Sequence, residues 1–307
     1  MFVIAFQNVL LTLLYVFPGF LLSKCKKASA SHLPTLSTVL VYACSPCMIL
    51  NSFLQLEYSH ETLLNMGIFL LIATVAQVGF MGLILLVFRK KWAEAKYRII
   101  TIGSVLGNVG FFGLPIVKAL LPNNPEVMSY SAMYVISMNL IAFTMGVFCL
   151  TEKKEYMTVK AGVVNPSTLG FFVALLCFFV GAGDYVPEIL RTGIRLLGDM
   201  STPLCMLILG IRLGTVSLRK LFLRPTVYLT CLGKLIVYPL FCYAAVYFLP
   251  LPFSLKASVM ILSATPCASI ILNLAEMHRS ETELSANSVL LSTLLCFITI
   301  PLLVLLL

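Results

Sequence analysis

The feature that most constrains this chain is the length of its apolar runs. A helix of roughly 20 apolar residues crosses a bilayer, and the 307-residue sequence contains ten runs of that kind. Charged residues make up only 11% of the chain, against about 25% in soluble domains. The runs do not alternate as barrel strands do, so we predict an all-α membrane protein with ten transmembrane helices. The predicted spans are 3–23, 33–55, 62–88, 97–121, 128–150, 163–182, 189–211, 221–249, 255–275 and 284–306.

The distribution of cations predicts the orientation. All but five of the 21 Lys and Arg residues lie in loops that follow odd-numbered spans, and the exceptions are Lys118, Arg191, Arg195, Lys234 and Lys256. The positive-inside rule then places both termini outside a multi-pass protein, which we expect in the plasma membrane. The net charge of +9 is spread along one membrane face, so we expect no nucleic-acid partner.

Ten helices with both ends on one side divide into two five-helix halves that enter the membrane in opposite orientations. Such an inverted repeat is typical of secondary transporters. "VYACSPCMIL" in the second span has a counterpart in "MSTPLCMLIL" in the seventh. We therefore predict a first repeat at 1–150, a short cytoplasmic linker at 151–162 and a second repeat at 163–307.

Two spans carry helix breakers at corresponding places. "GSVLGNVGFFGLPIV", residues 103–117, holds four glycines and Asn108, and we predict that the fourth span breaks at Pro115 and the ninth at Pro266. A mid-span proline frees a carbonyl that must find a partner or line a wet cavity. Neighbouring helices can satisfy a single kink, but a matched pair of breaks points to a substrate site near the midplane.

At these residues the chain resembles the auxin efflux carrier family, which includes plant PIN exporters and short bacterial carboxylate permeases. "GNVGFFGLPIV" resembles the family's fourth helix, "NPSTLGFFVALL" its sixth, "LGDMSTPLCMLILGIRLG" its seventh and "GKLIVYPL" its eighth. "ATPCASIILNLAEMHRSETELSANSVLLSTLLCFITIPLL" resembles the last two helices. The short linker "TEKKEYMTVKAG" is similar to that of the compact, PIN-like members.

The resemblance implies a specific architecture. The fourth and ninth helices would cross at their broken points. Helices 1, 2, 6 and 7 would form a scaffold, often dimeric, and helices 3–5 and 8–10 a transport domain that moves like an elevator. The chain departs from many small members in having Ser269 and Ile270 where they carry an asparagine.

The predicted substrate-binding residues surround the two breaks. Asn108 offers an amide donor and an acceptor, and half-helix N-termini favour negative charge. An amide there can instead satisfy the broken backbone. Glycines permit close crossing, and the prolines shape it without binding. The full set is Gly107, Asn108, Val109, Pro115, Thr265, Pro266 and Ser269, with Asn273 as a further lining residue or helix cap.

Two charged residues within spans are candidates for support or ion coupling. Lys234 lies well inside the eighth span, where a charge is costly enough to suggest a function. It either attracts an anion or pairs with Asp199, which we expect deep in the seventh span. Asp199 alternatively binds a coupling proton or sodium ion. We expect Lys234→Met to weaken anion transport more than folding.

The function predicted from these features is secondary transport of small organic anions, either auxin-like or mono- or dicarboxylate weak acids. A non-transporting metabolite sensor that uses the same cavity is the alternative. An intramembrane enzyme is disfavoured, because His32, His60 and His278 fall in loops or at helix ends and no paired aspartates or H-E-x-x-H motif occurs. We expect no cofactor and no metal. The expected partners are a small organic anion, the lipid bilayer and a second copy bound through the scaffold helices.

Overall fold

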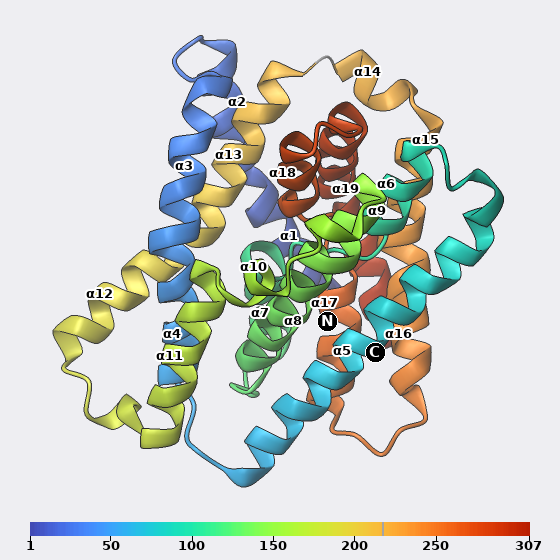
Figure 1. Cartoon of the computed structure of the whole chain (residues 1–307). Helices are drawn as coiled ribbons and strands as arrows, with labels where there is room; N and C mark the ends of the chain where they lie inside the picture. The colour runs from blue at the N-terminus through green and yellow to red at the C-terminus, as the bar shows by residue number, and fades with distance from the viewer. Residues whose placement is uncertain (217) are drawn as a thin grey trace.

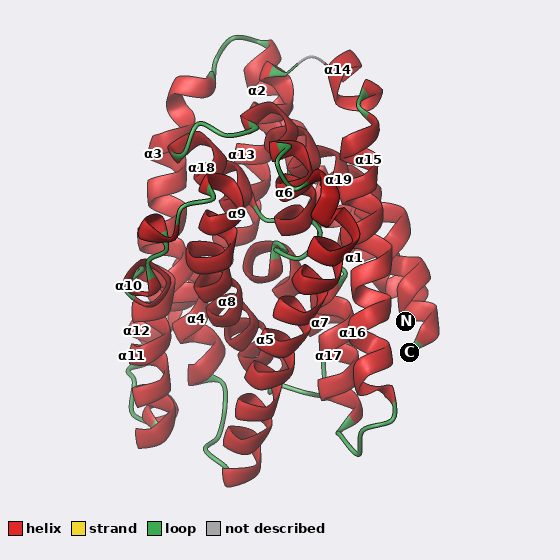
Figure 2. Ribbon diagram, turned by 45° about the vertical axis from the view of Figure 1, so that its right-hand side comes forward, coloured by secondary structure: helices red, strands yellow, loops and turns green. Residues whose placement is uncertain are grey.

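The computed structural model describes residues 1–216 and 218–307. The side chains of residues 184 and 218–220, which include the predicted loop cations Arg219 and Lys220, lie outside the described part. The described segments form helices joined by short loops, as Figures 1 and 2 show. An isolated bridge between Gly107 and Cys267 is the β-type pairing within this part of the chain.

Eight helical segments in the described residues are long and apolar enough to cross a membrane. They confirm a multi-pass, all-helical integral membrane protein. The elements of the first four are α1 Phe2–Leu14 and α2 Val16–Lys24; η1 Ala30–His32, α3 Leu33–Val39, η2 Leu40–Cys44 and α4 Ser45–Leu54; α5 His60–Phe88 and η3 Arg89–Lys91; and α8 Val127–Ile141, η5 Ala142–Gly146 and α9 Val147–Thr151.

The other four long segments belong to the second half of the chain. Their elements are η6 Lys154–Tyr156, α10 Val159–Val163 and α11 Pro166–Val180; α12 Glu188–Asp199 and α13 Ser201–Thr215; α15 Pro225–Leu232, η8 Gly233–Val237 and α16 Tyr238–Tyr247; and α19 Thr282–Leu303 with η9 Val304–Leu306. Two short connecting helices, η7 Ala182–Asp184 and α14 Leu218–Leu223, join consecutive segments.

The remaining two predicted spans are each interrupted. The fourth consists of α6 Ala95–Gly103, η4 Val109–Gly113 and α7 Leu114–Leu120, and the ninth of α17 Phe253–Ser263 and α18 Ser269–Met277. Pro266 lies in the ninth break as predicted. The prediction that the fourth span breaks at Pro115 is wrong, since its break covers residues 104–108 and Pro115 lies in continuous helix.

Pro115 does not break its helix because its missing hydrogen bond is replaced. A proline has no N–H, so the carbonyl of Phe111, four residues earlier, loses its partner. Thr202 Oγ1 of α13 donates to that carbonyl at 2.7 Å. The preceding turn, η4, is a widened π-helix. The same arrangement, a π-helix followed by a proline at the second position of the next α-helix, occurs at Pro46 and Pro239.

The helices form two groups with the interrupted segments between them (Figure 1). One group contains α2–α4 and α11–α13, in which α2 packs on α13 and α4 on α11 and α12. The other contains α5, α15, α16 and α19, and α5 packs on α8, α15 on α19 and α16 on α17. The N-terminal α1 packs against α19, so the two chain ends lie close together.

Glycines bring α2 and α13 into backbone contact. A methyl group added to Gly210 would overlap the carbonyl oxygen of Val16, and one added to Gly19 would overlap the carbonyl oxygen of Leu207. Small residues allow membrane helices to pack this closely, because association in lipid depends on van der Waals contact.

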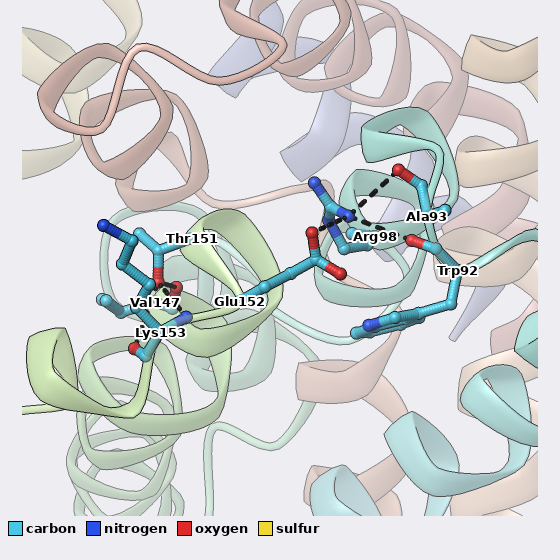
Figure 3. A network of polar contacts seen from close by, with 7 residues as sticks. All are labelled: Trp92, Ala93, Arg98, Val147, Thr151, Glu152 and Lys153. Carbon is cyan, nitrogen blue, oxygen red and sulfur yellow. Dashed lines mark hydrogen bonds and ion pairs between the residues drawn. The ribbon is translucent and has the colours of Figure 1, made fainter.

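A buried arginine fixes the first half of the interrupted fourth segment. Arg98 of α6 is 7% exposed, and its guanidinium donates to the carbonyl oxygens of Trp92 (3.0 Å) and Ala93 (3.3 Å) (Figure 3). The same Nη1 atom lies 2.7 Å from the Glu152 carboxylate at the end of α9. Arg98 thus ties α6 both to the preceding turn and to α9.

The close contact between α2 and α13 predicts that a methyl group at Gly210 destabilises the protein, whereas one at an open glycine does not. Gly210→Ala should lower the free energy of unfolding by about 2 kcal/mol, because the added methyl separates α2 from α13. Gly82→Ala on α5 is the matched control, since a methyl group there meets no atom within 4 Å. Apparent unfolding midpoints in detergent test the pair. Equal midpoints for the two variants would contradict the contact.

Arg98→Met should destabilise the protein by about 2 kcal/mol, because it leaves two carbonyls without their charged donor. Lys96→Met is the control on the same helix, since the Lys96–Glu94 pair is exposed and should contribute nothing measurable. The same unfolding measurement compares them. If Lys96→Met lowers the unfolding midpoint as much as Arg98→Met does, the buried Arg98 contacts do not stabilise the protein more than an exposed ion pair does.

Candidate functional site

The two helix breaks pair with each other through their backbones. Asn108 N–H donates to the Pro266 carbonyl at 2.7 Å, and Ala268 N–H donates to the Leu106 carbonyl at 3.0 Å. These bonds form the antiparallel bridge between Gly107 and Cys267. Cys267 N–H also donates to Ser292 Oγ of α19 at 2.9 Å. Several of the backbone groups that the breaks remove from helices therefore find partners within the protein, as a membrane interior requires.

Gly107 makes this crossing possible. A methyl group at Gly107 would meet Thr265 Oγ1 and Lys234 Nζ at less than normal contact distance. Only a residue without Cβ allows the two extended segments, Thr265 and Lys234 to meet at one point.

A cavity of about 350 Å³ lies against one side of the crossover. Its walls come from η2, α3, α4, α11 and α13 in the first helix group, and from η4, α8 and α18 around the breaks. Apolar side chains such as Met48, Val135 and Ile208 cover much of the surface. The polar lining residues are Ser37, Ser45, Asn108, Asn139, Asn165, Ser167, Arg212, Ser269 and Asn273.

The crossover presents hydrogen-bond donors to this cavity. The half-helices that start at Val109 and Ser269 have their first N–H groups directed out of the helix at the break. Gly110, Phe111, Ser269 and Ile270 line the cavity, and their backbone N–H groups make no hydrogen bond to another described residue. Two helix N-termini with free donors favour an anion.

The Asn108 amide also faces this cavity with weak protein contacts. Its Nδ2 lies 3.8 Å from Cys205 Sγ, a weak acceptor, and the residue is 6% exposed. The amide therefore retains capacity to bind a ligand.

The structure brings four of the predicted substrate-binding residues to the cavity: Gly107, Asn108, Val109 and Ser269. Asn273 lines it as well. Thr265 and Pro266 are buried at the crossover but are not among the lining residues, and Thr265 Oγ1 donates to the Leu262 carbonyl at 2.8 Å. Pro115 is not among them either, because it lies in α7 beyond the break. The cavity wall as described therefore does not include these three residues, and their contact with substrate stays a prediction.

Lys234 sits behind the crossover and does not line the cavity. It is fully buried, donates to the Ser263 carbonyl at 2.5 Å and lies 4.7 Å from the centroid of the Tyr238 ring. Ser263 is the last residue of α17, so the ammonium caps the negative end of that half-helix.

The expected Lys234–Asp199 pair is not found among the described residues. Asp199 ends α12, where the chain kinks into α13, and it is exposed. Asp199 lies within the segment Glu188–Thr215, which is long enough to cross a membrane, beside the one-residue turn at Met200 that separates α12 from α13. Its suggested role in ion coupling stays a prediction.

Sequence reasoning missed several lining residues. Arg212, which the cation count assigns to a loop, lines the cavity, and so does Asn139. Asn165 caps α11 by accepting from Thr168 N–H at 3.0 Å and also lines the cavity. A signal was present on α13, because Cys205, Ile208, Leu209 and Arg212 repeat with helical spacing on one face.

Lys234→Met should leave the apparent unfolding midpoint unchanged or raise it. Burying an unpaired ion costs several kcal/mol, which matches or exceeds the contribution of its hydrogen bond and its contact with Tyr238. The exposed Lys118→Met serves as control, and unfolding in detergent is the measurement. A loss as large as that expected for Gly210→Ala would show that Lys234 is retained for stability.

Comparison with known protein families indicates a membrane transport protein. The family described as membrane transport protein matches over residues 4–163 and 156–304, which is nearly the whole chain. No curated protein matches. The apolar helices, the paired breaks and this match together show that the chain belongs to the membrane transport protein family.

Proposed function

We propose that the protein is a secondary transporter of small organic anions and that it binds them in the crossover cavity. The observation that carries the proposal is the meeting of two half-helix N-termini, with free N–H donors, at a cavity inside a membrane protein. A carboxylate bound there gains charge-assisted hydrogen bonds and a favourable helix dipole.

The lining supports an anion over a cation. Arg212 is the charged side chain among the described lining residues, and no Asp or Glu accompanies it on the cavity wall. The Asn108 amide adds a donor beside the free N–H groups. The apolar walls suit the hydrocarbon part of an organic acid. Auxin-like acids and mono- or dicarboxylates, the classes implied by the resemblance to auxin efflux carriers, both fit this description.

The proposed mechanism is an elevator-type movement of one helix group against the other. The cavity lies between the first helix group and the segments around the breaks, so displacement of those segments against the first group would carry a bound anion with the crossover. In this proposal the ten segments form two inverted repeats, helices 1, 2, 6 and 7 are the scaffold, and two copies associate through it. Both termini face outward from the plasma membrane, and a proton or sodium gradient supplies the coupling.

Asn108→Ala should reduce saturable uptake at least tenfold, because it removes an amide from the proposed site. Asn123→Ala, an exposed loop position, is the matched control and should transport normally. Proteoliposomes are given labelled indole-3-acetate, malate, malonate or a monocarboxylate, with and without proton and sodium gradients. Binding without uptake of any anion would favour a sensor and overturn the transport proposal.

A further inference from the structure

One ion pair lies at the end of the cavity away from the crossover. Arg212 Nη1 of α13 donates to Glu276 Oε1 of α18 at 3.1 Å. The Arg212 side chain is 17% exposed and lines the cavity, while the Glu276 side chain is 49% exposed. Met277, the neighbour of Glu276, also lines the cavity and is 69% exposed. The cavity therefore reaches the surface beside this pair, at a place called here the mouth.

The position of Arg212 relative to the crossover follows from helix geometry. Cys205 lies against Asn108, and Arg212 is seven residues further along the same face of α13. Seven residues of α-helix rise about 10 Å. Arg212 is therefore separate from the donors at the breaks and lies on the path between them and the surface.

The ion pair joins the first helix group to the second half of the interrupted ninth segment. Arg212 belongs to α13, which packs on α2, whereas Glu276 belongs to α18, which packs on α19. Of the five N–H donors of the guanidinium, one bonds Glu276, and no other hydrogen bond from the group to a described residue is present. The half-exposed carboxylate is weakly held, because solvent screens such a pair.

We propose that Arg212 is the residue that first binds the carboxylate of the transported anion, and that it does so by exchanging Glu276 for the substrate. A carboxylate arriving at the mouth can accept two parallel N–H bonds from the guanidinium, which is a stronger geometry than the single bond to Glu276. Loss of the Arg212–Glu276 contact then releases α18 from α13. The anion thereby opens one of the contacts between the first helix group and the interrupted segments. This inference rests on the proposed transport function.

Charge at the mouth can be measured without knowing the substrate. Ser269→Cys supplies a half-buried reporter thiol that lines the cavity, whereas the native Cys205 is buried. The full chain in nanodiscs is treated with the anionic 2-sulfonatoethyl methanethiosulfonate or the cationic 2-(trimethylammonium)ethyl methanethiosulfonate. Mass spectrometry of the reporter peptide gives the ratio of the anionic to the cationic labelling rate.

The inference predicts opposite shifts for the two partners. Arg212→Gln leaves Glu276 unpaired and should lower the ratio about tenfold, because a nearby charge acts in opposite directions on the two reagents. Glu276→Gln frees the guanidinium and should raise the ratio by a similar factor. The double variant should return close to the original ratio. If Arg212→Gln fails to fold, the inference is tested by the labelling ratio of Glu276→Gln alone, which should rise.

A second ion pair provides the matched control. Arg224 and Glu283 are 2.7 Å apart, lie at the surface and do not line the cavity. Arg224→Gln and Glu283→Gln should leave the ratio unchanged. Uptake is measured beside labelling: transport with no shift at Arg212 or Glu276 overturns this inference alone. Shifts in labelling without uptake of any organic anion would overturn the proposed function and leave Arg212 as the anion-attracting residue of the cavity.

Discussion

The structure depends on the need to pair every backbone N–H and C=O group inside hydrocarbon. Two interrupted helices expose such groups at mid-chain, where lipid cannot satisfy them. The two breaks pair some of these groups with each other, through the bonds from Asn108 to Pro266 and from Ala268 to Leu106, and the N–H groups left free lie at the cavity. Neither interrupted segment would be tolerable alone. The crossing of the fourth and ninth segments is therefore a condition of the fold as well as the basis of the candidate site.

The crossover separates a buried cation on one side from free backbone N–H donors on the other. On one side, α17 ends at Ser263, whose carbonyl bonds the buried ammonium of Lys234. On the other side, the helices that begin at Val109 and Ser269 direct free N–H groups toward the cavity. A cation thus occupies the negative end of a half-helix, while the positive ends remain open to a ligand. Gly107 keeps the two sides within contact distance, since no larger residue fits between Thr265 and Lys234.

The successes and errors of the sequence predictions have physical causes. Asn108 at an unwound point was predicted correctly, because a polar amide between glycines in an apolar run disfavours a continuous helix. Pro115 was mistaken for the break because a proline removes a hydrogen bond wherever it stands, while the donor that compensates, Thr202, is 91 residues away along the chain. The expected Lys234–Asp199 pair was wrong because Asp199 is exposed at the end of α12 whereas Lys234 is buried, and hydropathy alone does not show which charged residues meet. Arg212 was missed because the positive-inside rule counts every cation near a loop. The rule does not consider where the side chain of that cation lies.

The sequence by itself determined the class of the molecule: an all-helical membrane protein with two helices broken at glycine- and proline-rich points. These properties are local, since apolar length and the absence of an N–H or a Cβ act within a few residues. Only the tertiary structure decided which residues meet. It paired Lys234 with a carbonyl instead of a carboxylate, put Arg212 beside Glu276 and gathered side chains from distant helices around one cavity. Those contacts depend on how helices far apart in the sequence pack together, and short-range sequence patterns do not predict that packing.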